Sequence, residues 1–261
     1  MEGTVAVVLF AWMIVSVMML ILWLVEVKTQ NAGFVDIGWA LGLVLTCAVY
    51  YIKIDGLSTR KEFILAMVSL WAIRLLWLLV RRLLKDPAED KRYQKIRADW
   101  KTSVHLKFLF FFQSQGLLDI ILSMPFLFII RNPSQSFHAL EYAAVVIWLT
   151  GFLGEMAADN QLSRFKSNSA NRGKTCQAGL WYYSRHPNYF FEWLMWVGYC
   201  IFALTSPGGW LSIVAPVLMY YFLLQVSGVP LAEAQALKTR GEEYRRYQET
   251  TSMFVPWPKR K

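Results

Sequence analysis

The sequence predicts an all-α polytopic membrane protein with about seven transmembrane helices, and three observations predict it. Of the 261 residues, 56% are hydrophobic and only 17% are charged, whereas soluble domains usually carry about 25% charged residues. Aromatic residues make up 16%, and the apolar residues fall in blocks about as long as a bilayer is thick. So much apolar surface must be kept from water, which excludes a disordered chain, a collagen, a disulfide scaffold and an ordinary cytosolic enzyme.

The apolar blocks define the expected helices in chain order within a single integral-membrane domain, residues 1–261. Each block is long enough for about 20 residues of tilted helix at 1.5 Å rise per residue. We expect spans at Val5–Val25, Phe34–Tyr51, Phe63–Leu84, Phe108–Ile130, Leu140–Ala158, Tyr189–Leu204 and Trp210–Ala232. The first block lacks the basic start and cleavage site of a signal peptide, so it is expected to remain as a helix. The polar interruption Gln113–Gly116 in the fourth span either lines a cavity or marks a helix bend.

The net charge of +9 is explained by topology rather than by nucleic-acid binding. With the N-terminus outside and the C-terminus cytosolic, 22 of the 27 Lys and Arg residues fall on the inner side. Four fall on the outer side and Arg74 lies within a span. The positive-inside rule therefore predicts this orientation, with the basic loops near anionic lipid head groups. We expect a monomer in a bacterial inner membrane or the endoplasmic reticulum.

Metal and Rossmann-type sites are not expected. The three cysteines and three histidines have neither disulfide nor zinc-ligand spacing. No Gly-x-Gly-x-x-Gly fingerprint is present, and close helix packing explains Gly151 and Gly154 better than a nucleotide loop.

Five carboxylates lie near the predicted cytosolic ends of the spans. An ionisable residue in a span is costly unless it is paired or hydrated. Their common depth predicts a polar cavity that opens to the cytosol; the alternative is that these acids simply occupy the head-group layer. The five are Asp36, Glu155, Asp159, Glu192 and Glu233.

The segment Gly179–Glu192 is the most informative part of the sequence. Pro187 fits the first turn of a helix, where its missing N–H costs nothing. The free N–H groups of such a helix start attract a phosphate or carboxylate, and Arg185 and His186 stand beside it as donors. Asn188 and Glu192 are four residues apart, so they share one helix face and can bind a ligand together.

These residues carry a resemblance to a known family. Arg185-His-Pro-Asn-Tyr189 followed by Glu192 resembles the signature of the steroid 5α-reductase and sterol reductase superfamily. A related Arg-His-Pro pattern occurs in membrane methyltransferases of the isoprenylcysteine carboxyl methyltransferase type. Further segments resemble one branch of the 5α-reductase-like proteins, namely Phe34–Trp39, Glu89–Tyr93, Ala158–Leu162, Arg240–Tyr244 and Phe254–Trp257.

The resemblance implies a seven-helix enzyme in which residues 131–261 hold NADPH and residues 1–130 admit a steroid or other lipid-like substrate. The cations of the Arg164–Arg185 loop, Arg172 included, suit the cofactor phosphates. Glu233 stands where the family often has a His. The cofactor positions carried over are Asp159, Asn160, Arg164, Lys166, Tyr183, Arg185, His186, Asn188, Tyr189, Glu192, Glu233, Arg240 and Tyr244.

The catalytic positions match the family less closely. Asp36 takes the approximate place of a family Glu, and Trp71, which has no acidic proton, falls where a Tyr is expected. Tyr93 or Tyr50 is the substitute donor. We expect Asp36, Arg74 and Tyr93 to form the catalytic set, with Arg74 as the ionic neighbour of Asp36; the alternative is a structural Asp36–Arg74 pair.

The resemblance implies an NADPH-dependent oxidoreductase acting on CH–CH groups, similar to a 3-oxo-5α-steroid 4-dehydrogenase. Hydride addition to a conjugated enone builds charge on the distant oxygen, where a hydrogen-bond donor stabilises the transition state. An S-adenosylmethionine-dependent methyltransferase is the alternative, because the Arg-His-Pro segment could hold a carboxylate. A transporter or scaffold is the third class, although the sequence lacks the paired broken helices typical of transporters.

Overall fold

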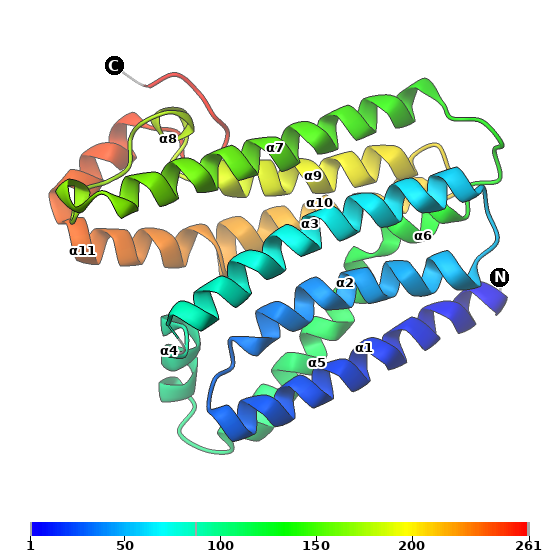
Figure 1. Cartoon of the computed structure of the whole chain (residues 1–261), viewed down its shortest axis with the longest axis horizontal. Coiled ribbons are helices and arrows are strands. Elements are labelled where there is room, and N and C mark those ends of the chain that lie inside the picture. Colours follow the sequence, from blue (N-terminus) through cyan, green and yellow to red (C-terminus); the bar gives the residue numbers. More distant parts are fainter. Residues whose placement is uncertain (1, 87, 260–261) are drawn as a thin grey trace. The chain divides into compact units, whose positions relative to one another are not determined.

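The computed structural model describes residues 2–86 and 88–259, and these form helices joined by short loops (Figure 1). Within these ranges no strand element forms, apart from an isolated bridge between Ser184 and Ser252. Among the described residues, six helices are long and apolar enough to cross a membrane. The predicted fold class is therefore confirmed: this is an all-α, multi-pass integral membrane protein. The orientation of the chain, with its N-terminus outside and its C-terminus in the cytosol, stays a prediction.

Six of the seven predicted spans reach the length and hydropathy of a membrane crossing. The exception is α9, a helix of 17 residues. Gly228 separates the last helices from one another. The longer helices are α1 (Glu2–Thr29), α2 (Phe34–Lys53), α3 (Ser58–Lys85), α5 (Val104–Leu122), α7 (Ala139–Ser167), α9 (Pro187–Ala203) and α11 (Val229–Thr250). The shorter elements are α4 (Lys91–Asp99), α6 (Met124–Ile130), η1 (Ser169–Asn171), α8 (Leu180–Tyr183), η2 (Gly209–Ile213), α10 (Val214–Tyr221) and the π-helical turn η3 (Phe222–Val226).

The chain divides into two compact units. Unit 1 comprises Met1–Phe137 and Ala203–Ser212, and unit 2 comprises His138–Phe202 and Ile213–Lys261. The assignment of residues 1–130 to the substrate and 131–261 to the cofactor stays a prediction.

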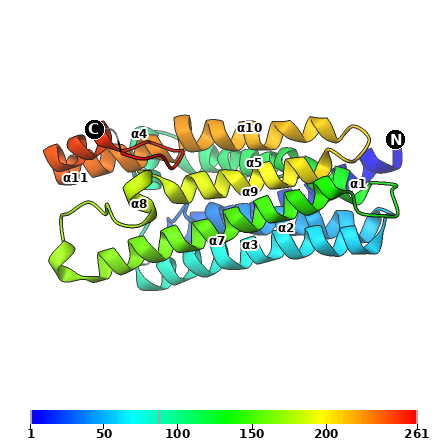
Figure 2. The same ribbon diagram turned by 90° about the horizontal axis from the view of Figure 1, so that it is seen from above.

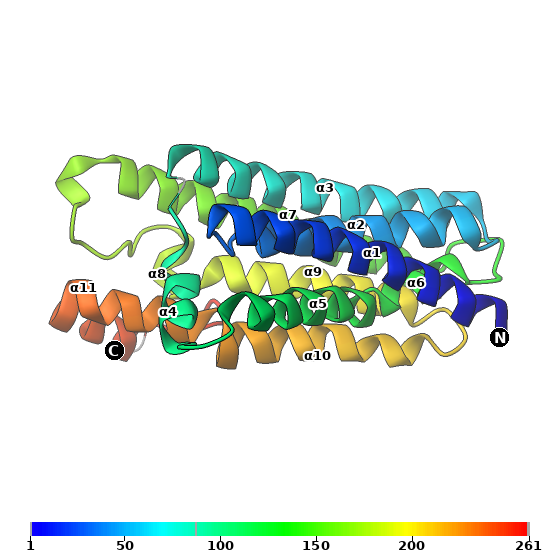
Figure 3. The same cartoon turned by 90° about the horizontal axis from the view of Figure 1, so that it is seen from below.

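Unit 1 is built from α1, α2, α3 and α5, which lie alongside one another (Figures 1 and 3). Apolar side chains of α1 and α5, such as Val15, Met19, Phe108 and Phe112, form a buried cluster. The outer face of α1 exposes large apolar residues, which suits contact with lipid; these are Val5, Leu9, Met13, Val17, Ile21 and Leu24.

The polar interruption in the fourth span is a contact between helices, and α5 runs through it unbroken. Ser16 Oγ of α1 donates a hydrogen bond to Gln113 Oε1 at 2.6 Å, and Gln113 Nε2 donates to the Ser16 carbonyl at 3.1 Å. The break comes later, at Ser123, where α5 ends and α6 begins with Pro125 in its first turn. Proline at that position cannot continue the preceding hydrogen-bond ladder.

In unit 2, α7 and α9 lie side by side (Figure 2). A Cβ atom at Gly151 would lie 2.8 Å from the carbonyl oxygen of Phe191, and one at Gly154 would lie 2.4 Å from the Phe191 ring. Only glycine allows the two helices to approach this closely. The predicted packing role of both glycines is confirmed.

Candidate functional site

In unit 2, a buried cluster of charged groups joins the start of α9 to α11. Arg185 Nε donates to Glu233 Oε1 at 2.7 Å, and His186 Nε2 lies 3.2 Å from the same oxygen. Gln248 Nε2 donates to Glu233 Oε2 at 2.7 Å. Arg185 Nη1 also donates to the carbonyl oxygens of Gln248 and Thr251, at 2.9 and 2.7 Å. We call Arg185, His186, Glu233 and Gln248 the Glu233 cluster.

The segment after α11 is fastened to the same region by backbone hydrogen bonds. The Arg185 N–H donates to the Ser252 carbonyl at 2.8 Å, and the Trp257 N–H donates to the Tyr183 carbonyl at 2.9 Å. Ser184 Oγ donates to the Phe254 carbonyl at 2.7 Å. This C-terminal segment, residues 251–257, therefore holds the loop that leads into α9.

The structure gives Arg185 and His186 partners within the chain, and their predicted role in cofactor binding stays a prediction. Arg185 Nε and Nη1 and His186 Nε2 contact Glu233 or carbonyl oxygens of the chain, because α11 places a carboxylate beside them. Tyr189 stacks on the His186 ring with centroids 5.4 Å apart, and the Tyr244 hydroxyl lies 3.4 Å from Glu233 Oε1. These five predicted cofactor residues thus form one structural cluster.

A second group of predicted residues lies on the facing sides of α7 and α9. Asn188 Nδ2 donates to Asp159 Oδ1 at 3.3 Å, and Trp196 Nε1 donates to Glu192 Oε1 at 2.9 Å. Asn188 Oδ1 is buried and has no hydrogen-bond partner in the described part of the chain. Asn188 and Glu192 thus contact different partners, and their joint binding of a ligand stays a prediction.

A basic pocket of about 430 Å³ lies between the end of α7, the following loop and α11. Its cations are Lys166, Arg172, Lys174 and Arg240, and none of the described residues that line it is an Asp or Glu. The Arg240 guanidinium lies over the Tyr244 ring, 5.1 Å from the centroid. The remaining predicted residues, Asn160, Arg164 and Tyr183, are exposed and do not line this pocket.

In unit 1, two side chains of α4 donate hydrogen bonds to the Asp36 carboxylate. Tyr93 Oη donates to Asp36 Oδ1 at 2.7 Å, and Arg92 Nη2 donates to Asp36 Oδ2 at 2.8 Å. Burial, followed by the charge of Asp36, raises the pKa of the Tyr93 phenol, so Tyr93 keeps its proton and acts as a neutral donor. Arg92, and not the expected Arg74, is the ionic partner of Asp36. The alternative of a structural Asp36–Arg74 pair is wrong for the same reason.

The other tyrosine considered from sequence is occupied elsewhere. The Tyr50 hydroxyl lies 3.1 Å from Ser123 Oγ, deep between α2 and α5. Trp71 is 3% exposed, and its ring packs edge-on against Trp39 with centroids 5.3 Å apart. Tyr93 is therefore the tyrosine that contacts Asp36.

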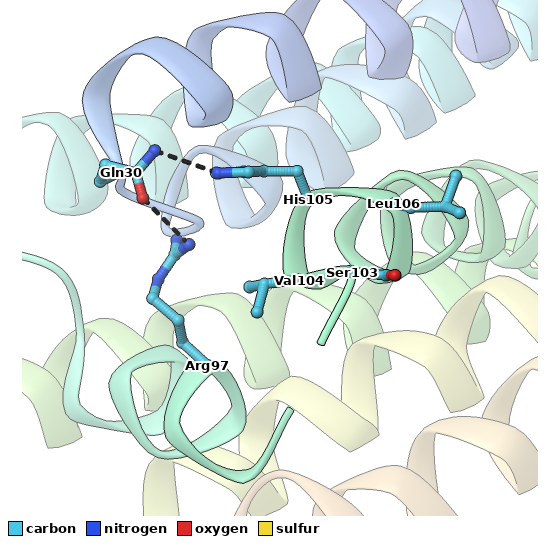
Figure 4. Close-up of a pocket in the computed structure, with 6 residues that line it drawn as sticks. All are labelled: Gln30, Arg97, Ser103, Val104, His105 and Leu106. Carbon is cyan, nitrogen blue, oxygen red and sulfur yellow. Dashed lines mark hydrogen bonds between the residues drawn. The ribbon is translucent and has the colours of Figure 1, made fainter. Parts of the chain in front are cut away.

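Sequence reasoning missed a polar cluster at the end of α1. Arg97 Nη2 donates to Glu26 Oε1 and Glu89 Oε1, each at 2.8 Å, and His105 Nδ1 lies 3.2 Å from Glu26 Oε2. Gln30 lies between Arg97 and His105 at an open pocket of about 450 Å³ (Figure 4). Glu26 at the end of an apolar block was the available signal, but its partners are 71 and 79 residues away.

Asp90 caps α4 and gives a prediction about pH. Burial would raise the pKa of the Asp90 carboxyl, but hydrogen bonds and charge from Arg92, with the charge of Arg82, outweigh burial and lower it below 3.8. A lowered folded-state pKa stabilises the fold above the unfolded pKa, and this stabilisation is lost as pH falls through 3.8 and below. We expect Asp90→Ala to reduce the free energy of unfolding by about 1 kcal/mol at neutral pH.

Unfolding measured across acidic pH checks this expectation. The difference between wild type and Asp90→Ala should shrink as the solution becomes more acidic, because Asp90 is then protonated in both states. A difference that stays constant over the whole acidic range would contradict the assigned role of the carboxylate.

Fold and site together define a class: a multi-pass membrane protein with polar clusters and a basic pocket at helix ends. The chain belongs to the family described as "Protein of unknown function (DUF1295)", whose model matches residues 22–251. It is 26% identical over 212 residues to a protein of Schizosaccharomyces pombe described as uncharacterized, with 71% of this chain covered. The match spans 61% of that relative's length. No solved structure matches the chain.

Proposed function

We propose that the protein is an NADPH-dependent membrane reductase of the steroid 5α-reductase-like superfamily, acting on a conjugated double bond of a steroid- or lipid-like substrate. The observation that carries the proposal is the basic pocket of unit 2, where four cations gather without a lining carboxylate. In this proposal the pocket faces the cytosol and the substrate enters from the lipid, and the protein works as a monomer.

The basic pocket suits the phosphates of NADPH. The 2′-phosphate and pyrophosphate together carry several negative charges, and each is held best by charge-assisted hydrogen bonds from Arg or Lys. Lys166, Arg172 and Arg240 supply such donors from three separate elements. S-adenosylmethionine has no phosphate, so it has less use for these cations.

The α7–α9 face suits the nicotinamide end. The unpartnered Asn188 Oδ1 can accept a hydrogen bond from a carboxamide N–H, and Asp159 lies beside it as a further acceptor. When bound, NADPH would supply the hydride for reduction.

The chain's own contribution to polarising the substrate is assigned to Asp36, Arg92 and Tyr93. Asp36 accepts hydrogen bonds from both partners, so it orients donors and does not itself act as the acid. The Arg92 side chain is 33% exposed, and in this proposal its guanidinium meets an oxygen of the substrate. A preorganised cation of this kind stabilises negative charge that develops on that oxygen.

Calorimetry on the purified protein with NADPH, NADH and S-adenosylmethionine tests the proposal. We expect NADPH to bind more tightly than NADH, because only NADPH carries the 2′-phosphate. Arg172→Ala should weaken NADPH binding by about 10- to 150-fold, the value of a hydrogen bond to a charged group. Arg246→Ala is the matched control, since Arg246 is an exposed cation outside the pocket lining.

Other outcomes would lead to the other classes. Binding of S-adenosylmethionine alone would make the protein a methyltransferase. Binding of none of the three would favour a scaffold or transporter, and equal losses for Arg172→Ala and Arg246→Ala would remove the basic pocket from the proposal.

A further inference from the structure

Unit 1 buries a carboxyl group between α2 and α5. The Asp119 side chain is 0% exposed, and neither of its oxygens has a hydrogen-bond partner within residues 2–86 and 88–259. Glu26 is also 0% exposed, but it contacts Arg97 and His105. Asp119 is therefore an acid in the middle of an apolar span whose charge is balanced by no cation of the described chain.

The neighbouring helix is shaped around this carboxyl. A Cβ atom at Gly42 would lie 2.1 Å from Asp119 Oδ2, so the carboxyl occupies the space that any other residue would fill. One turn further along α2, Thr46 is 0% exposed, and its hydroxyl has no partner in the described chain. One turn beyond that, Tyr50 contacts Ser123, the residue that follows α5 and lies four positions after Asp119. The faces Gly42–Thr46–Tyr50 and Asp119–Ser123 thus meet as a polar row.

The cost of burying the Asp119 carboxyl in the membrane interior decides which ion can bind there. An ionised carboxylate in a membrane interior is strongly unfavourable without a cation or hydrogen-bond donors. Hard metal ions need about six oxygen ligands, whereas the row offers the side chains of Asp119, Thr46, Tyr50 and Ser123, and the last two already contact each other. No cluster of three or more His, Cys, Asp or Glu side chains suited to a metal occurs among the described residues. A proton removes the charge and needs no further ligand.

We propose that Asp119 is a proton-binding site in the membrane interior, held as a neutral carboxylic acid at the α2–α5 interface with Thr46 as its polar neighbour. The bound proton comes from solvent and converts a carboxylate into an acid. The site uses none of the residues assigned to reduction, so it stands or falls independently of the proposed function.

Infrared spectroscopy of the protein in lipid vesicles tests the site without requiring an activity. We expect wild type at neutral pH to show the C=O stretching band of a protonated carboxyl, part of which shifts on labelling with ¹³C-aspartate. Asp119→Asn should abolish that aspartate-sensitive part while remaining folded, because an amide has the shape of a neutral acid. Asp55→Asn, at an exposed aspartate, should leave the band unchanged.

Three results would overturn the proposal. The first is the absence of an aspartate-sensitive band in wild type at neutral pH, and the second is its persistence in Asp119→Asn. The third is its loss when sodium chloride replaces choline chloride, which would make the site a cation site. Should Asp119→Asn not fold, Gly42→Ala gives the second variant. It should perturb the same band, because the added methyl group meets the carboxyl, and an unperturbed band in folded Gly42→Ala would equally contradict the site.

Discussion

Glu233→Ala is expected to lower the free energy of unfolding by about 3–5 kcal/mol, the cost of breaking a buried ion pair by removing one partner. The Arg185 and Glu233 side chains are only 9% and 14% exposed. The substitution leaves the Arg185 guanidinium without its carboxylate, and it removes the acceptor that His186 and Gln248 share.

Thermal or denaturant unfolding in detergent measures this effect, and the same helix offers a control. Glu242 pairs with Arg245 at 3.2 Å, but these side chains are 75% and 65% exposed. Exposed pairs contribute about 0–1 kcal/mol, so Glu242→Ala should change stability little. Equal losses for the two variants would show that the Glu233 cluster does not hold α9 to α11.

Asp36→Asn is expected to lower kcat about 10²- to 10³-fold, the typical cost of losing one electrostatic contribution to a transition state. This expectation rests on the proposed reductase activity. Arg92 would lose the carboxylate that orients it, although it would keep its contact with Asp90. NADPH affinity should be unchanged, because the basic pocket is built from unit 2.

Turnover with a conjugated 3-oxo steroid, measured as NADPH consumption, checks the second prediction. Asp99→Asn is the matched control, because Asp99 is exposed at the end of α4. A folded Asp36→Asn protein that reduces substrate at the wild-type rate would show that Asp36 has no catalytic part.

The membrane helices could be predicted because their signal is local. A block of about 20 apolar residues has few alternatives to a membrane helix. The pair Gly151 and Gly154 was readable for a similar reason, since small residues three apart on one span indicate close packing. The short length of α9 and the break at Ser123 could not be predicted to the exact residue. Helix ends depend on turns and on Pro125 rather than on hydropathy.

The site was harder to predict, because its contacts join distant segments. Arg74 was a reasonable partner for Asp36 in the sequence, yet α4 folds back so that Arg92 takes that place, 56 residues away. The loop cations Lys166 and Arg172 line one pocket together with Arg240, whereas Arg164 is not among its lining residues. Nothing in the sequence indicated that Arg185 would form an ion pair with Glu233.

The Glu233 cluster also bears on how the protein is made. Arg185 is synthesised 48 residues before Glu233, so the loop before α9 is made while its compensating carboxylate does not yet exist. The carbonyls of Gln248 and Thr251 emerge later still, 63 and 66 residues behind Arg185. The loop before α9 therefore reaches its final form only after α10 and α11 have been made.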